Sequence, residues 1–170
     1  MSIGLIQSYT AVSDQLASSV VTNAKLGTDI AIGARIYQIP VAADTVTQGT
    51  WAYGPNTNQS GCNNYNNNAS GAVNDEVIFQ VYLAAGTYTI ECIGITSNDC
   101  GISTWLDGST SLGTMDWYSA GATNNVRKTI TGVAIATNGL KAIHLKMATK
   151  NGASSAYKIN LCSFCFIRTA

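Results

Sequence analysis

Charged side chains are scarce in this sequence. Only 11% of its 170 residues are charged, against about 25% in typical soluble domains. Nine Lys and Arg residues balance nine Asp and Glu residues, so the formal net charge is zero. The basic residues form no cluster, and we therefore expect no nucleic-acid partner. Such low charge is typical of proteins that bury a large surface against copies of themselves.

Long apolar runs are also missing. No stretch approaches the roughly 18 apolar residues that a membrane-spanning helix needs, so we expect no membrane partner. The start, MSIGLIQSYTAVSDQ, has no basic region and only a short apolar patch. We therefore expect no signal peptide, and a product that is made in a cytoplasm and not exported by the usual route.

The cysteines do not form a complete set of pairs. Five is an odd number, which excludes a full disulfide framework. We expect buried free thiols, with a Cys92–Cys100 cross-link as the alternative. The CSFC segment from Cys162 to Cys165 has the spacing of half a zinc site, but it lies in a segment that alternates like a strand, where positions i and i+3 face opposite sides. The sequence therefore predicts no metal and no cofactor.

A recognisable catalytic pattern is lacking as well. The one histidine, His144, lies opposite the inward set Ile143, Leu145 and Met147 of a predicted strand, so we expect it at the surface rather than beside a nucleophile. Most Asp and Glu residues lie at turns, which does not favour a glycosidase pair. A phosphate-binding loop and a calcium loop are also missing. We therefore predict that the protein is not an enzyme.

What the sequence does contain is a run of strands over residues 75–170. DEVIFQVYLAAGTYTIECIGIT alternates as two strands joined by a turn at Ala85 and Gly86, and at least five further strand-like segments follow at turn-marked intervals. This pattern, with no helical segment between strands, predicts an all-β fold: an antiparallel, jelly-roll-like β-sandwich over residues 41–170. The Asn-rich stretch NTNQSGCNNYNNNASGAVND near its start is predicted to be a loop.

Residues 1–40 are predicted to form an N-terminal arm, extended or partly helical. Val12, Leu16 and Val20 lie on one face of a possible short helix. So thin an aliphatic stripe cannot form a core alone and needs a partner surface. We expect anchoring or trimerisation to use the apolar side chains of the arm: Ile3, Leu5, Ile6, Val12, Leu16 and Val20.

Aromatic residues near turns give a hypothesis for ligand binding. Sugar-binding surfaces combine exposed aromatic faces with Asp and Asn side chains, and Trp105 beside Asp107 has this composition. Trp117 and Tyr118 complete the set of candidate glycan contacts. The alternative is that the tryptophans cover the edges of the sandwich or pack between subunits.

Two segments carry a family resemblance. GTYTIECIGITSNDCGISTWLDGSTSLGTMDWYSA and VRKTITGVAIATNGLKAIHLKMATKNGASSAYKINLCSFCFIR resemble the C-terminal domains of bacteriophage fibre and other virion appendage proteins. The upstream SSVVTNAKLGTDIAIGARI is similar to phrases of phage fibre shafts, through Val21 to Leu26.

The resemblance implies a structural protein of the virion. It implies a homotrimer with its arm docked on capsid, neck or tail proteins, and heads that contact host surface glycans or decorate the particle. Symmetric closure would give each arm the surface it lacks. The short shaft favours a head fibre, neck fibre or decoration protein. Because Ala-Gly-Thr-Tyr and Leu-Asp-Gly hairpins also occur in carbohydrate-binding modules, the alternative is a stand-alone carbohydrate-binding module.

Overall fold

The described part of the chain is built from strands. The computed structural model describes residues 35–38, 45–55, 63–66 and 71–170. The first four strands are short: β1 (Arg35–Gln38), β2 (Thr45–Gln48), β3 (Ala52–Pro55) and β4 (Asn63–Asn66). The longer ones follow: β5 (Glu76–Leu83), β6 (Gly86–Thr96), β7 (Ile102–Asp107), β8 (Thr110–Asp116), β9 (Thr123–Ile135), β10 (Gly139–Thr149) and β11 (Asn160–Arg168).

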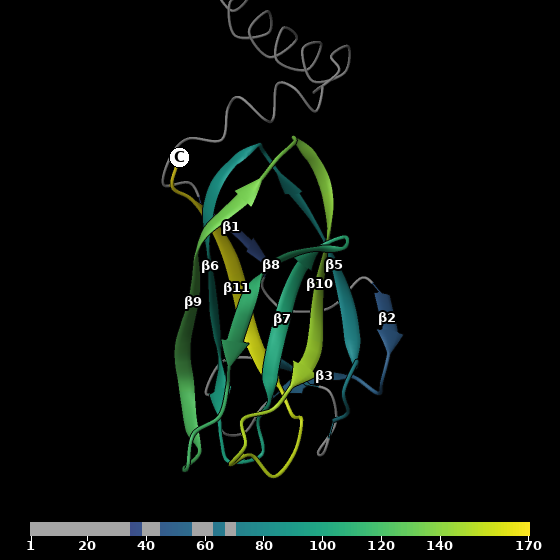
Figure 1. Ribbon diagram of the computed structural model, residues 1–170, viewed down its shortest axis with the longest axis vertical. Coiled ribbons are helices and arrows are strands. Elements are labelled where there is room, and N and C mark those ends of the chain that lie inside the picture. The colour runs from purple at the N-terminus through teal and green to yellow at the C-terminus, as the bar shows by residue number, and fades with distance from the viewer. Residues whose placement is uncertain (1–34, 39–44, 56–62, 67–70) are drawn as a thin grey trace, which may run out of the picture.

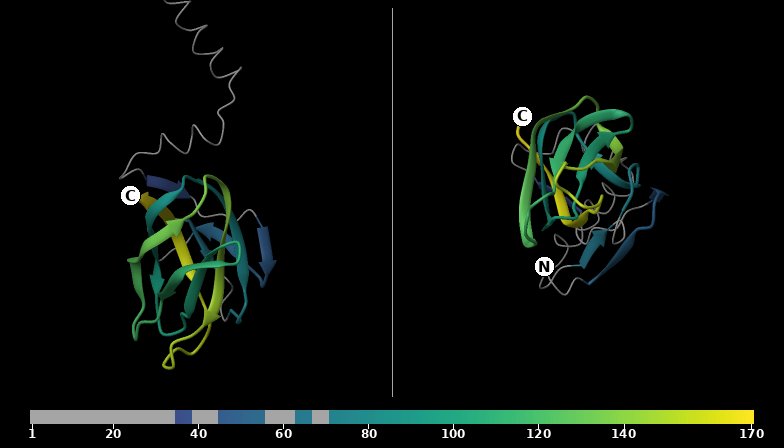
Figure 2. Two further views of the ribbon diagram at one scale, coloured as in Figure 1. Left: turned by 45° about the horizontal axis from the view of Figure 1, so that its top comes forward. Right: turned by 60° about the horizontal axis from the view of Figure 1, so that its bottom comes forward.

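These strands form two antiparallel sheets that pack face to face (Figure 1). One sheet has the order β3-β4-β11-β6-β9, with β1 also paired to β11, and the other has the order β2-β5-β10-β7-β8. The chain crosses between the sheets repeatedly, so β6, β9 and β11 lie opposite β5, β7 and β10 (Figure 2). The predicted all-β antiparallel sandwich is confirmed. None of the described segments is a helix able to cross a membrane.

The two ends of the sandwich differ. The turns β5–β6 and β9–β10 and the C-terminus lie at one end, and the connections β6–β7, β8–β9 and β10–β11 gather at the other (Figure 1). This arrangement follows from alternating strand directions, because every second connection must lie at the same end. Loops far apart in the sequence thereby become neighbours.

Alternation along the strands builds the core. Val77, Phe79, Val81 and Leu83 of β5 are buried on one face, in line with the alternation predicted for DEVIFQVYL, because successive side chains of a strand face opposite sides. At the centre, the ring of Phe164 lies between Phe79 and Trp105, with centroid separations of 4.9 and 5.1 Å in edge-to-face geometry.

The N-terminal boundary and the Asn-rich loop differ from expectation. Arg35–Gln38, within the predicted arm, is strand β1 and pairs with β11. Asn63–Asn66, within the predicted loop, is strand β4 and pairs with both β3 and β11. Composition alone predicted a loop there because Asn disfavours strands, but pairing with two neighbours supplies backbone hydrogen bonds that override this weak preference. The apolar arm residues Ile3 to Val20 and the predicted short helix lie outside the described residues.

The cysteines divide into two groups. Cys92, Cys100 and Cys165 are buried free thiols, as predicted, so the alternative Cys92–Cys100 cross-link is not formed. Cys162 is disulfide-bonded, which corrects the expectation of free thiols throughout. A cysteine in a disulfide cannot be a thiolate ligand, and the CSFC segment on β11 is therefore not half of a zinc site.

Candidate ligand-binding site

The two tryptophans predicted to contact glycan are in the core. Trp105 and Trp117 are each 0% exposed, so neither ring can stack on a sugar, and this part of the hypothesis is wrong. Trp105 alternates with outward residues of β7 and meets Phe164. Trp117 donates a hydrogen bond from Nε1 to Oγ of Ser103 over 3.0 Å. Both rings belong to the hydrophobic core of the sandwich, a position that neither the glycan hypothesis nor its alternative, packing at the edges or between subunits, predicted.

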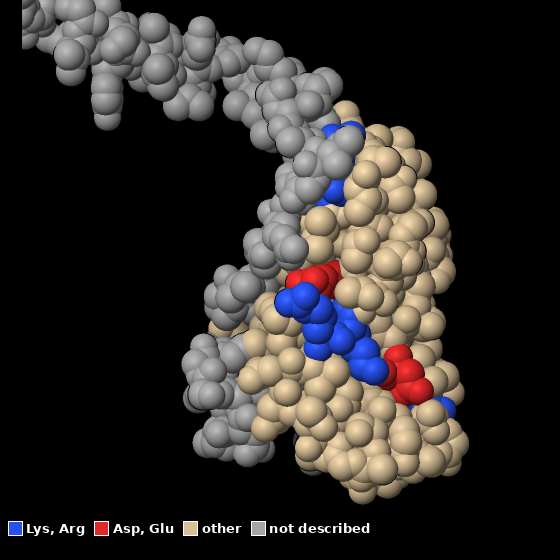
Figure 3. Space-filling view, turned by 90° about the vertical axis from the view of Figure 1, so that its left-hand side faces the viewer, with Lys and Arg blue, Asp and Glu red and all other residues tan. Residues whose placement is uncertain are grey.

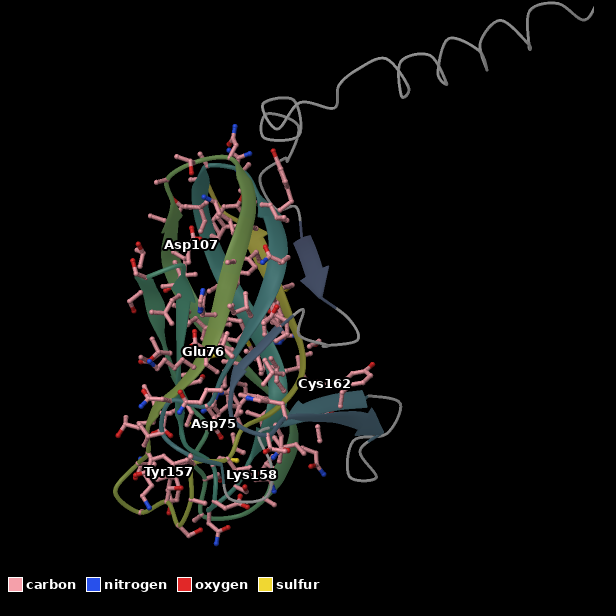
Figure 4. All side chains as sticks on the ribbon, turned by 90° about the vertical axis from the view of Figure 1, so that its right-hand side faces the viewer. Asp75, Glu76, Asp107, Tyr157, Lys158 and Cys162 are labelled. Atoms are coloured by element: carbon pink, nitrogen blue, oxygen red, sulfur yellow. The ribbon has the colours of Figure 1, made fainter. Side chains whose placement is uncertain are left out.

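Asp107 and Tyr118 lie far from each other. Asp107 ends β7, forms an ion pair of 3.6 Å with Lys141, and lies toward the end of the molecule opposite Tyr157 and Lys158 (Figure 4). Tyr118 follows β8, is half-buried, and pairs with Ser97 in an isolated bridge. Of the four predicted glycan contacts, Tyr118 alone is both partly exposed and on the loop-rich end.

Three connections at that end form what we call the loop platform: residues 97–101, 117–122 and 150–159. Backbone hydrogen bonds join all three. The amide of Ser97 donates to the carbonyl of Trp117 over 3.3 Å, that of Trp117 to Gly101 over 3.0 Å, and that of Gly101 to Lys158 over 2.9 Å. The platform is therefore held by the same kind of bond as the sheets, which suits a preformed binding surface.

Side chains fix the platform further. Asp116, the last residue of β8, accepts a hydrogen bond from the amide of Tyr118 over 2.9 Å and another from Nδ2 of Asn151 over 3.0 Å. The hydroxyl of Ser154 donates to the carbonyl of Cys100 over 2.7 Å. These bonds tie the longest loop to the other two, so the positions of its exposed side chains are set by the sheets beneath.

A glycine lets Trp117 support the platform from below. A Cβ atom on Gly94 of β6 would lie 2.4 Å from the carbonyl oxygen of Asn160 and 2.8 Å from the ring of Trp117. Both distances are shorter than the contacts that Cβ atoms make in proteins, so any residue other than glycine would overlap its neighbours here. Trp117 therefore positions its neighbour Tyr118 without contacting solvent.

The exposed surface of the platform combines aromatic rings with polar groups. Tyr118 and Tyr157 are half-buried, and the ammonium nitrogen of Lys150 lies 5.1 Å from the ring centroid of Tyr157. Tyr157 and Lys158 lie together at this end (Figure 4). Nζ of Lys158 is 3.4 Å from Oδ2 of Asp99. Such a set can stack on a sugar ring and hydrogen-bond to its hydroxyls.

Asp99 is ionised on this surface even in mild acid. Partial burial raises the pKa of its carboxyl, but the hydrogen bond from the hydroxyl of Ser97 and the charge of Lys158 outweigh burial. The net pKa lies below its ordinary value of 3.8. Asp99 is thus a fixed hydrogen-bond acceptor rather than a proton donor.

His144 is in a different place, on the outer face of the β5-containing sheet. Its inward neighbours Ile143, Leu145 and Met147 are fully buried, as predicted. Nδ1 of His144 contacts the carboxylate of Glu76. Its directly opposite cross-strand partners are Ile78 and Leu106, which carry no hydroxyl or thiol.

Charge elsewhere is sparse and mixed. The face seen in Figure 3 is mostly uncharged, and its basic and acidic groups adjoin one another. Arg127 of β9 and Glu91 of β6 form a pair at 3.6 Å. Within the described ranges, no group of three His, Cys, Asp or Glu side chains is placed to hold a metal ion.

The important residues that sequence reasoning missed are Asn151, Tyr157 and Lys150. All three lie in KNGASSAYK, within the second of the two segments that carry the family resemblance, but none was proposed as a ligand contact. The available signal was topological: in an antiparallel sandwich, this loop must share an end with SNDC and DWYSAG. Assigning alternate connections to the same end of the sandwich would have placed these three loops side by side.

Comparisons with known proteins identify the fold. No family model and no curated protein sequence match the chain. Among solved structures, a Paenibacillus xanthan lyase matches with TM-score 0.65 and 25% identity over 82% of this chain, which corresponds to 14% of that chain. The chain therefore spans a small part of that enzyme.

Two further structures match over nearly their whole length. The CBM36-1 domain of a multidomain xylanase from the hindgut metagenome of Trinervitermes trinervoides has TM-score 0.53 and 19% identity, over 78% of this chain and 94% of that chain. A carbohydrate-binding module from Cellvibrio mixtus lichenase 5A, solved in complex with cellotriose, has TM-score 0.52 and 17% identity, over 82% of this chain and 100% of that chain. The fold is thus that of β-sandwich carbohydrate-binding modules.

Proposed function

We propose that this jelly-roll-like sandwich is a non-catalytic carbohydrate-binding module and that its ligand lies across the loop platform. The fold likeness to modules solved from a xylanase and a lichenase supports the proposal. The observation that carries it is the pair of partly exposed rings, Tyr118 and Tyr157, on loops fixed by hydrogen bonds to Asp116 and Asn151. Aromatic rings on a rigid scaffold bind sugars with little ordering cost.

The role follows from what the platform's groups do. The tyrosine rings offer apolar faces to the C–H face of a pyranose. Asp99 offers a carboxylate that accepts hydrogen bonds from hydroxyls, and Lys158 beside it offers donors. None of these groups needs to react, so binding and positioning of a polysaccharide is sufficient.

Binding of the full chain to a panel of soluble polysaccharides, measured by affinity electrophoresis and calorimetry, tests this function. We expect Tyr118→Ala and Tyr157→Ala each to weaken binding about tenfold or more, since one buried ring contributes on the order of 1 to 3 kcal/mol. Tyr82→Ala is the matched control, because Tyr82 is a half-buried tyrosine of β5 away from the platform. Failure of the wild-type chain to bind any polysaccharide would refute the proposal.

The virion role stays a prediction. The residues expected to anchor or trimerise the arm, Ile3 to Val20, lie outside the described residues, and no comparison points to a particle protein. A head that binds host surface glycan would combine that role with the module. The oligomeric mass of the chain with and without residues 1–34, which leaves strand β1 in place, tests the homotrimer.

A further inference from the structure

The loop platform holds one lysine without a carboxylate partner. Of its two lysines, Lys158 lies 3.4 Å from Asp99. Lys150 has no Asp or Glu oxygen within 4.0 Å among the residues that the structure describes, and its ammonium lies over the ring of Tyr157, 5.1 Å from Nζ to the centroid. The ring stabilises the ammonium but leaves its full positive charge and its donors for another group.

Hydrogen bonds fix the backbone next to Lys150. The next residue, Asn151, donates from Nδ2 to Asp116 over 3.0 Å, and its Oδ1 accepts from the amide of Ala153 over 3.1 Å. The amide of Ser154 donates to the carbonyl of Asn151 over 2.9 Å. The residue that follows Lys150 is thus held both to strand β8, through Asp116, and within its own loop, through Ala153 and Ser154.

Two carboxylates adjoin this site, that of Asp99 within the platform and that of Asp116 at the end of β8, and both are already engaged. Asp116 accepts from Asn151 and from the amide of Tyr118. Asp99 is bonded to Ser97 and paired with Lys158. Neither neutralises Lys150, yet both would repel a polyanion with closely spaced charges. The platform therefore suits a ligand whose negative charges are few and separated by neutral sugar units.

From this arrangement we propose that the ligand is an acidic saccharide, whose carboxylate or sulfate group is bound by Lys150 beside Tyr157. The proposal rests on the proposed function and names the class of saccharide for the same site. The ammonium donates charge-assisted hydrogen bonds to the anionic group. The tyrosine rings and the polar groups around them contact the rest of the sugar chain.

A matched pair of probes isolates the charge. Glucuronoxylan, whose glucuronate groups are separated by neutral xylose units, is tested beside its methyl-esterified form, in which the carboxylates are neutral and the sugar backbone is unchanged. Affinity of the full chain is measured by calorimetry at low and at high salt. We expect the charged form of the bound polysaccharide to bind about tenfold tighter than its ester at low salt, because hydrogen bonds between charged groups are stronger than neutral ones. The difference should narrow at high salt.

Variants assign this preference to Lys150. Lys150→Met keeps the apolar stem and should bind the charged form about tenfold more weakly, near the level of the ester. Its affinity for the ester should change by less than about twofold, and Lys150→Arg should retain the preference. Lys146→Met is the control: Lys146 lies on β10, about 13 Å of strand away, beyond the Debye length of about 8 Å at physiological salt. It should bind like the wild type.

The outcomes separate the two proposals. Equal binding of charged and esterified forms by the wild type, or an equal loss on both forms for Lys150→Met, would overturn the acidic ligand and leave a neutral-saccharide module standing. Absence of binding to either form of any polysaccharide would overturn both proposals. Thermal unfolding of each variant shows whether it is folded, so a loss through misfolding is recognised.

Discussion

The indole N–H of Trp117 donates to the hydroxyl of Ser103 over 3.0 Å, and both side chains are fully buried between the sheets. This bond joins β7 to the start of the loop platform. The other buried indole differs, because Nε1 of Trp105 has no hydrogen-bond partner within the described structure. The indole N–H of Trp117 is therefore hydrogen-bonded and that of Trp105 is not. Replacing these two residues should change the free energy of unfolding by different amounts.

Trp117→Phe should destabilise the protein more than Trp105→Phe. Both substitutions remove similar volume, but Trp117→Phe also leaves the hydroxyl of Ser103 buried without its donor, which costs about 1 to 3 kcal/mol. Trp105→Phe removes a donor that was already unpaired, so no such loss applies. Urea unfolding followed by far-UV circular dichroism measures both free energies of unfolding. Equal destabilisation by the two variants would contradict the assigned bond.

The disulfide at Cys162 predicts the thiol count. A disulfide uses two of the five cysteines, so the denatured, unreduced chain should give three reactive thiols and the reduced chain five. In the native state, reaction should be slow, since burial raises the pKa of Cys92, with Cys165 and Glu91 adding to the effect. Ellman's reagent measures each count.

Cys162→Ser is the control for the thiol count. It should leave four reactive thiols in the denatured, unreduced chain, because the partner of Cys162 is released. Five thiols in the unreduced wild-type chain would show that no disulfide is present. Since disulfides persist in oxidising surroundings, the preparation must be made without reductant.

Much of the fold could be predicted from the sequence, because the alternation of apolar and polar residues along a strand indicates which side chains are buried. Val77, Phe79, Val81 and Leu83 alternate with polar residues, and all four face the core. Strand β4 could not be predicted, since NNYN has no alternation and owes its conformation to β3 and β11. Long-range pairing of this kind is not encoded in local composition.

The binding site was harder to predict because exposure depends on neighbours in space. Trp105 and Asp107 are two apart on β7, so they share one side of the strand. Yet Trp105 is covered by the opposite sheet, whereas Asp107 lies where the sheet ends and reaches Lys141. Tyr118 and Tyr157 belong to one platform because the β8–β9 and β10–β11 connections, which each pass from one sheet to the other, lie at the same end; this relationship is visible only once the strand order is known.

Acid should weaken the loop platform through Asp99. Its pKa in the folded protein is lowered, because the Ser97 hydrogen bond and the Lys158 charge outweigh burial. A depressed pKa stabilises the folded state at pH values above the pKa of the unfolded chain, about 3.9. This stabilisation is lost as the pH falls through 3.9 toward the lower folded value, since the unfolded state then binds the proton more readily.

A titration of the Asp99 carboxyl by NMR measures this effect directly. We expect a midpoint below about 3.9 in the wild type, and a higher midpoint in Lys158→Met, where the neighbouring positive charge is gone. The stability difference between the wild type and Asp99→Asn should be largest near neutral pH and should shrink in acid. A wild-type midpoint at or above the ordinary value would contradict the assigned partners, because burial alone would raise it.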